Sequence, residues 1–414
     1  MQLTSFWYLL PRTKNSMAIL HPFKALRPVP EKAQEVACVP YDVINTREAR
    51  ELAEGKPGSF LHVIRPEIDL PEGIDEHADE VYETGAANLR AIAAGEDTVQ
   101  EDVPSVYVYR LIMNGRSQTG IFGCVAVSDY DSDVILKHEL TRPVKEDDRT
   151  RHILTQQAHA EPVMLTFKDD DGVSAIIEST MNAEPLYDLT ADDGVQHTIW
   201  RVEDTTALVD RFKEIDKLYV ADGHHRCKAA SRAAAQEPSN PEAGFFPAVL
   251  FPMGDMEILA YNRTVKSLPG GSDAFAQRLR NSFDLVPTDN PVPGSKGSIC
   301  VYINGEWLAM SLPATTGGKV VDELDVSRLS EHLLAPLLDI TDPRRDPNID
   351  FVGGIRGTTE LEKRVNDGEA ELAISMYPTS IQELVDVSDA GLLMPPKSTW
   401  FEPKLRSGLL IHLF

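Results

Sequence analysis

An apolar strand passes directly into an alanine-rich helix in the stretch Leu218-Tyr219-Val220-Ala221-Asp222-Gly223-His224-His225-Arg226-Cys227-Lys228-Ala229-Ala230. The run Lys217–Ala221 predicts a short buried strand, and His225–Ala235 predicts a helix. Gly223, which lies between them, lets the backbone turn tightly. Because the first N–H groups of a helix have no partner within it and attract an anion, the stretch predicts a strand-to-helix anion site.

Five residues of this turn are candidates for holding a phosphate group: Asp222, Gly223, His224, His225 and Arg226. Arg226 and the two histidines would add charge-assisted donors to the backbone N–H groups, and the missing side chain of Gly223 would allow close approach. A structural interpretation is also open. In it, Asp222 caps the helix, the glycine makes the turn and the histidines are ordinary surface or core groups.

The chain on both sides of this turn mixes strands and helices without a regular alternation. A helix is predicted over Asp75–Ala94, and another over Thr205–Ile215. Hairpins are predicted around Asn114-Gly115, Gly254-Asp255 and Asn304-Gly305, because these pairs separate runs typical of strands. The sequence therefore predicts an α+β fold with mixed and antiparallel sheets plus helices.

The length of 414 residues predicts two or more lobes. The stretch Val286–Gly297 is rich in proline and glycine, so it is either a lobe boundary or a long loop.

Charge and cysteine content restrict the partners and the compartment. Acidic residues number 65 against 40 basic ones, which gives a formal charge of −25. Such an excess repels phosphate backbones and anionic lipid, so neither nucleic acid nor a membrane is expected as a partner. The four cysteines form no C-x-x-C pair, and no apolar run approaches the ~20 residues of a membrane span. We therefore expect a cytoplasmic protein.

A second polar cluster occupies Lys137–His152, where acids and bases alternate on both sides of a proline. Such a loop could offer a carboxylate base, a hydroxyl group and several cations together. Its candidate residues are His138, Glu139, Thr141 and Arg149. A solvated run of charges is the alternative interpretation.

Two further segments contribute candidates. Asp42 is a carboxylate within an extended apolar stretch, where it could orient a substrate or hold a metal, although an Asp that makes a turn beside a proline is also common. Near the C-terminus, Met394–Gly408 carries three cations against one acid in an otherwise acidic chain. Lys397 and Lys404 are the candidates there for binding phosphate.

Together these segments resemble the family called domain of unknown function 1015. The matching stretches are Pro22–Pro28, Pro40–Ile44, Lys137–Glu139 with Thr141 and Arg149, Asp222–Arg226 and Met394–Lys404. Since the resemblance begins near Met17, residues 1–16 are expected to be an upstream extension.

The turn at Gly223 also resembles the G-x-x-R-x-x-A phosphate box of the ParB/sulfiredoxin superfamily. This resemblance implies a nucleotide-binding core over residues 17–285, and a further α+β lobe over 286–414 that contributes basic residues to the same site. Sulfiredoxin has its reactive cysteine where this chain has His224, so sulfinic-acid repair is not expected. ParB proteins carry a DNA-reading helix-turn-helix, which is not recognisable here. Free serine kinases carry a similar Asp-Gly-His-His-Arg box.

The resemblance implies a nucleotide-dependent phosphotransferase that acts on the hydroxyl group of a small amino acid, with free L-serine as the leading acceptor. Mg²⁺ with ATP or ADP would be the cofactor. Glu139 or Asp42 would accept the hydroxyl proton or hold the metal, and His225 would assist. His138 and Thr141 would contact the substrate.

The remaining cations would complete the phosphate site. Residues 223–226 would cradle the nucleotide phosphates, and Arg149, Lys397 and Lys404 would form the surrounding cationic wall. The alternative is a non-catalytic, ParB-like nucleotide switch that acts through a protein partner. A catalytic carboxylate opposite the phosphates would favour the enzyme.

Overall fold

The computed structural model describes residues 17–315 and 317–414, so the expected extension 1–16 lies outside the described residues. The chain divides into two compact units. Of the described residues, the first contains 17–136, Thr141–Asp255 and Pro403–Phe414, and the second contains Lys137–Leu140 and Met256–Glu402. Among the described residues, no helix has the length and apolar character to cross a membrane.

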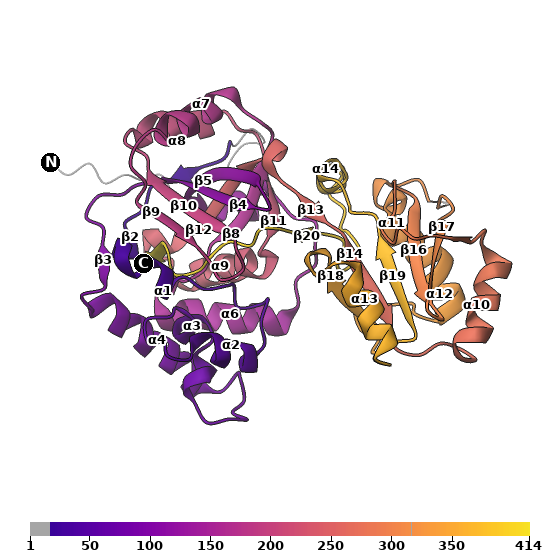
Figure 1. Ribbon diagram of the computed structural model, residues 1–414. Coiled ribbons are helices and arrows are strands. Elements are labelled where there is room, and N and C mark those ends of the chain that lie inside the picture. Colours follow the sequence, from indigo (N-terminus) through magenta and orange to yellow (C-terminus); the bar gives the residue numbers. More distant parts are fainter. Residues whose placement is uncertain (1–16, 316) are drawn as a thin grey trace. The chain divides into compact units, whose positions relative to one another are not determined.

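The first unit is built on a nine-stranded mixed sheet (Figure 1). Its order is β6-β11-β8-β12-β5-β4-β10-β9, and β1 also pairs with β5. The pairs β6–β11 and β8–β12 are parallel and the others are antiparallel. The strands are β1 Leu20–His21, β4 Tyr107–Met113, β5 Arg116–Ala126, β6 Ile135–Leu136, β8 Val163–Phe167, β9 Tyr187–Thr190, β10 Gln196–Arg201, β11 Leu218–Asp222 and β12 Phe245–Pro252.

A second, four-stranded antiparallel sheet in this unit has the order β3-β2-β21-β7. Its strands are β2 Ala25–Pro28, β3 Thr98–Gln100, β7 Ala158–His159 and β21 Ile411–Leu413. The C-terminal segment is thus an inner strand of this sheet.

The helices of the first unit complete its core, and α6 packs along α9. The helices are α1 Ala33–Val36, α2 Thr46–Ala53, α3 Leu61–Ile64, α4 Asp79–Ala94, α5 Val127–Asp131, α6 Pro143–Gln156, α7 Asp171–Thr180, α8 Thr205–Phe212 and α9 His224–Gln236. Apolar residues of α7, α8 and α9 join those of the large sheet in one buried cluster.

The second unit contains a six-stranded antiparallel sheet of order β15-β17-β16-β19-β14-β18 and a two-stranded ribbon of β13 and β20. Its strands are β13 Ile258–Leu259, β14 Tyr261–Val265, β15 Val286–Pro287, β16 Ser298–Ile303, β17 Glu306–Ser311, β18 Ile349–Gly353, β19 Leu372–Met376 and β20 Trp400–Phe401. Its helices are α10 Gly271–Ser282, α11 Asp325–Leu329, α12 Ala335–Leu338, α13 Gly357–Asn366 and α14 Ile381–Asp389.

The predicted α+β class with mixed and antiparallel sheets is confirmed. The hairpin at Asn114-Gly115 joins β4 to β5, and the one at Asn304-Gly305 joins β16 to β17. All four residues have positive φ, between 52° and 80°. Asn-Gly is the residue pair that tolerates this backbone conformation best, which explains why these two turns could be predicted.

The hairpin predicted at Gly254-Asp255 is wrong. These residues form a 3₁₀ turn, Met253–Asp255, after which β13 pairs with β20 rather than with β12. The Asp255 carboxylate accepts the backbone N–H of Thr119 at 3.0 Å and so fastens the turn to β5. The turn ends the segment Thr141–Asp255 of the first unit.

The expected boundary at 286 also differs from the division observed. Val286–Gly297 lies wholly inside the second unit, where Val286 and Pro287 pair with β17. Proline and glycine there mark a loop that leads to β16.

Gly120, in β5, tests the packing of the large sheet. A Cβ atom at this position would lie 2.5 Å from the backbone oxygen of Leu250 and 2.7 Å from a ring carbon of Phe251. Gly120→Ala must therefore move β12, and we expect the free energy of unfolding to fall by about 1–3 kcal/mol in urea denaturation. Gly244→Ala is the control, since a Cβ there would meet no atom within 4 Å. Equal unfolding midpoints for the two variants would contradict this packing.

Candidate phosphate site

The predicted strand, glycine and helix are present as β11, Gly223 and α9. Gly223 adopts φ 98° and ψ 31°, a conformation that favours glycine. A Cβ atom at Gly223 would lie 3.0 Å from Nε of Arg226 and 3.1 Å from a methyl group of Val163. Gly223 itself is the N-cap of α9, so the interpretation in which Asp222 occupies the cap position is wrong.

Arg226 is the charged centre of this turn and is only 8% exposed. One of its terminal nitrogens donates to the backbone oxygen of Pro162, and the other lies 3.3 Å from Oδ2 of Asp222. Its Nε is buried and has no hydrogen-bond partner among the described residues. Burial lowers the pKa of Arg226, but Asp42, Asp222 and Glu161 outweigh that effect and raise it. The guanidinium therefore remains a cation among carboxylates.

Asp222 is shared between two cations. Besides Arg226, Nζ of Lys404 lies 3.6 Å from its Oδ2. Burial alone would raise the pKa of Asp222, but Lys404 and Arg226 lower it to about 2. The structure thus brings Lys404, predicted from the basic C-terminal segment, to the predicted turn.

The two histidines of the turn have different surroundings. His224 is buried, and burial lowers its pKa to about 4. His225 accepts the backbone N–H of Arg142 at Nε2, with a distance of 3.1 Å. Because Arg142 is the N-cap of α6, this bond brings the N-terminus of α6 beside that of α9. Thr141 lies next to this contact, and its hydroxyl donates to Glu146 at 2.5 Å.

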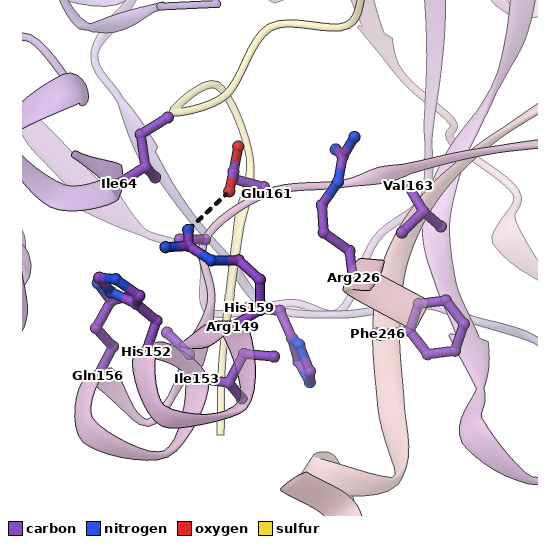
Figure 2. Close-up of a pocket in the computed structure, with 12 residues that line it drawn as sticks. Ile64, Arg149, His152, Ile153, Gln156, His159, Glu161, Val163, Arg226 and Phe246 are labelled. Carbon is purple, nitrogen blue, oxygen red and sulfur yellow. Dashed lines mark ion pairs between the residues drawn. The ribbon is translucent and has the colours of Figure 1, made fainter. Parts of the chain in front are cut away.

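Helix α6 also places Arg149 inside the unit. Its guanidinium donates to Asp148 at 2.9 Å and lies 4.0 Å from the centre of the Tyr41 ring. A terminal nitrogen lies 3.8 Å from Oε2 of Glu161, and Figure 2 shows this pair beside Arg226. Burial opposes the charge, but Asp148 and its neighbours raise the pKa of Arg149.

Glu161 is a site residue that sequence reasoning missed. Its side chain is 6% exposed, and Oε1 accepts the backbone N–H of Tyr41 at 3.0 Å and the hydroxyl of Ser407 at 3.4 Å. Burial raises the pKa of Glu161, while Arg226 and Arg149 only partly offset that effect. The available sequence indication was a carboxylate placed next to Pro162, directly before the apolar strand β8.

Asp42 belongs to the same unit and lies in the loop that precedes α2. It is exposed, and among the carboxylates that act on Arg226 it has the largest effect. A carboxylate that is both solvent-accessible and near the guanidinium can face a ligand held there.

The other three predicted residues belong to the second unit: His138, Glu139 and Lys397. The backbone oxygen of His138 accepts the N–H of Met394 at 2.7 Å, which ties this short segment to the basic stretch. Lys397 has φ 58°, and its Nζ lies 5.3 Å from the centre of the Tyr261 ring. Convergence of these residues on Arg226 stays a prediction.

A small cavity adjoins the buried charges. Its volume is about 30 Å³, counted as the space open to the centre of a water-sized sphere. Its polar lining comes from Arg149, His152, Gln156, His159, Glu161 and Arg226. Within residues 17–315 and 317–414, no group of three or more His, Cys, Asp or Glu residues has an arrangement that could hold a metal ion.

The chain belongs to the DUF1015 family, described as proteins of unknown function, whose sequence profile matches residues 20–327. The match includes Pro22–Pro28, Pro40–Ile44, Lys137–Arg149 and Asp222–Arg226, whereas Met394–Lys404 lies outside it. No curated protein matches the chain.

The solved structures that are similar to this chain have low TM-scores. A conserved hypothetical protein from Pyrococcus furiosus is 13% identical, with a TM-score of 0.35 over 70% of this chain and 95% of its own. A free serine kinase in complex with AMP is 12% identical, and its TM-score is 0.37 over 70% of this chain and 92% of its own. C-terminally truncated SbnI from Staphylococcus aureus is 13% identical, and its TM-score is 0.37 over 70% of this chain and 87% of its own. At such scores these similarities carry no argument about activity.

The burial of His224 gives a direct test of the site. Because its pKa is about 4, the imidazole should remain neutral from pH 8 down to pH 5.5. In NMR spectra of histidine-labelled protein, its ring signals, assigned by their loss in His224→Gln, should not shift over that range. A titration midpoint near 6.5 would contradict the buried position of His224.

Proposed function

We propose that this chain is a nucleotide-dependent phosphotransferase whose phosphate site is centred on Arg226. ATP or ADP with Mg²⁺ would be the donor, and the hydroxyl group of a small amino acid, L-serine first, the acceptor. The observation that carries the proposal is the buried Arg226 beside Gly223, with its Nε unpartnered among the described residues at the start of α9. The proposal includes a ParB/sulfiredoxin-like core.

The chemistry of the turn fits a phosphate group. The first N–H groups of α9 and the helix dipole favour an anion, and the bare backbone of Gly223 leaves room for it. Arg226 and Lys404 supply two positive charges in a chain whose formal charge is −25. A phosphate ligand needs such a local concentration of cations, because the rest of the protein repels it.

The carboxylates near Arg226 fit the remaining needs of phosphoryl transfer. Mg²⁺ is usually held by one or two carboxylates together with substrate phosphates. Asp222 and Asp42 are the residues that would face it here. Catalysis then depends mainly on positioning and charge stabilisation, with one group to accept the hydroxyl proton. Asp42 is the leading candidate for that base, because it acts on Arg226 and is exposed. Glu139 is the second candidate, and His225 would assist.

Arg226→Lys tests the cradle while keeping a positive charge among the carboxylates. Alanine is less suitable, because it would leave buried carboxylates without their counter-charge. Loss of the planar guanidinium should weaken ADP binding by roughly 10-fold to 100-fold, measured by calorimetry.

Arg211→Lys is the matched control for that experiment. Arg211 makes two bonds to Asp170, at 2.6 and 2.7 Å, in the same unit but outside the site. Its replacement should leave ADP affinity unchanged. If Arg226→Lys also bound ADP as wild type does, the assignment of Arg226 to the phosphate site would be wrong.

Asp42→Asn tests catalysis apart from binding. The amide keeps the shape of the side chain but cannot accept the proton, so turnover should fall by about two to four orders of magnitude while ADP binding persists. The assay follows labelled phosphate transferred from ATP or ADP to a panel of free amino acids, with L-serine first. Glu139→Gln is measured in parallel.

The two variants separate the candidate bases. Loss of turnover in Glu139→Gln alone would assign the base to Glu139. Nucleotide binding without a labelled product from wild type, with any acceptor, would favour the non-catalytic switch.

A further inference from the structure

Glu161 occupies an unusual position behind the proposed phosphate site. It is a buried carboxylate that acts on both Arg149 and Arg226, yet it makes a hydrogen bond to neither. Its two hydrogen bonds within the described part of the chain use Oε1, whereas Oε2 is 3.8 Å from a terminal nitrogen of Arg149. That separation is too long for a direct hydrogen bond, so Arg149 and Glu161 interact there through their charges alone.

The cavity that adjoins Glu161 has room for water. Its volume of about 30 Å³ compares with roughly 10–15 Å³ for a single water by the same measure. Three nitrogen atoms of the residues that line this cavity are buried and have no hydrogen-bond partner among the described residues. They are Nε of Arg226, Nδ1 of His152 and Nε2 of His159. Water would satisfy such groups and would give a proton a route to Glu161.

The charged and titratable groups around Glu161 belong to several elements of the first unit. Arg149 of α6 and Arg226 of α9 are cations, and Asp42 is an anion beside the neutral phenol of Tyr41. The Cys38 thiol faces it from the segment paired with Ser407, and burial raises the pKa of that thiol. Burial also lowers the pKa values of His152 and His159, so both imidazoles are neutral at pH 7. The two arginines are therefore the nearby charges that favour ionised Glu161, and burial opposes them.

We propose that Glu161 takes up a proton from solvent when a phosphate group binds to Arg226. This inference rests on the proposed nucleotide site and specifies its regulation. An incoming phosphate adds negative charge near Glu161 and also draws Arg226 into a new pairing. Both effects favour the neutral carboxyl group. In the free protein, burial already brings Glu161 closer to that state by raising its pKa.

The sign of the pH dependence follows from linkage. A ligand whose binding takes up a proton binds more weakly as pH rises through the range between the free and bound pKa values of that group. At full uptake, the affinity for ADP should fall by about tenfold per pH unit in that range. Glu161→Gln is permanently neutral, so it should bind ADP at least as tightly at high pH and lose this dependence.

The experiment is calorimetric titration of the full chain with ADP in Tris and in HEPES, whose different ionisation enthalpies reveal protons taken up on binding. Protonation of ADP itself is the same for every variant and cancels in the comparison. Glu67→Gln is the matched control, because Glu67 is equally buried and is paired with Arg65 at 2.8 Å. Wild type and Glu67→Gln should take up more protons than Glu161→Gln.

Equal proton uptake in all three proteins would overturn the role of Glu161 while leaving the nucleotide site intact. No binding heat from wild type in either buffer would overturn the nucleotide site and this inference with it. If Glu161→Gln does not fold, difference infrared spectra of wild type decide the question. The carbonyl stretch of a protonated carboxyl group should appear when ADP is added, and its absence would contradict the proposal.

Discussion

The buried guanidinium of Arg226 is the interaction on which the candidate site depends. It links carboxylates from separate parts of the first unit, namely the loop at Asp42, the end of β11 at Asp222 and the approach to β8 at Glu161. It also donates to the backbone oxygen of Pro162. A buried cation is tolerated only when such partners compensate for its lost hydration. The same partners hold the guanidinium in place at the start of α9.

This arrangement makes the site a competition between anions. Three carboxylates already act on Arg226, so an incoming phosphate must share or displace them. Lys404 eases this competition because it is a second cation beside Oδ2 of Asp222. Glu161 cannot move into water, since it is buried and bonded to Tyr41 and Ser407. Glu161 can then give up its negative charge only by taking up a proton, and this connects phosphate binding to pH.

Local patterns in the sequence were sufficient to predict the turn at Gly223 and the hairpins at Asn114-Gly115 and Asn304-Gly305. In each case a backbone conformation with positive φ selects the residues, so the structure is encoded within a few positions. The hairpin expected at Gly254 failed because pairing of β13 depends on β20, about 140 residues away in the chain. Composition near residue 286 likewise resembled a boundary but marks a loop inside one unit.

The candidate site could be predicted only in part. Arg149, Lys404 and Asp42 were chosen by residue type, and the fold places them in the same unit as Arg226. Glu161 was missed because a carboxylate beside a proline and before an apolar strand is as typical of a loop residue as of a buried group. Its role depends on Arg149 of α6 and Arg226 of α9, which only the fold brings near it. The positions of His138, Glu139 and Lys397 relative to Arg226 remain a prediction.

A crystal structure of the full chain with ADP and Mg²⁺ would test the central claim most directly. The account predicts the terminal phosphate at the first turn of α9, within hydrogen-bond distance of the Arg226 guanidinium and close to Gly223, with Asp42 facing it. A nucleotide bound elsewhere, with Arg226 still engaged only by Asp222 and Pro162, would contradict the account.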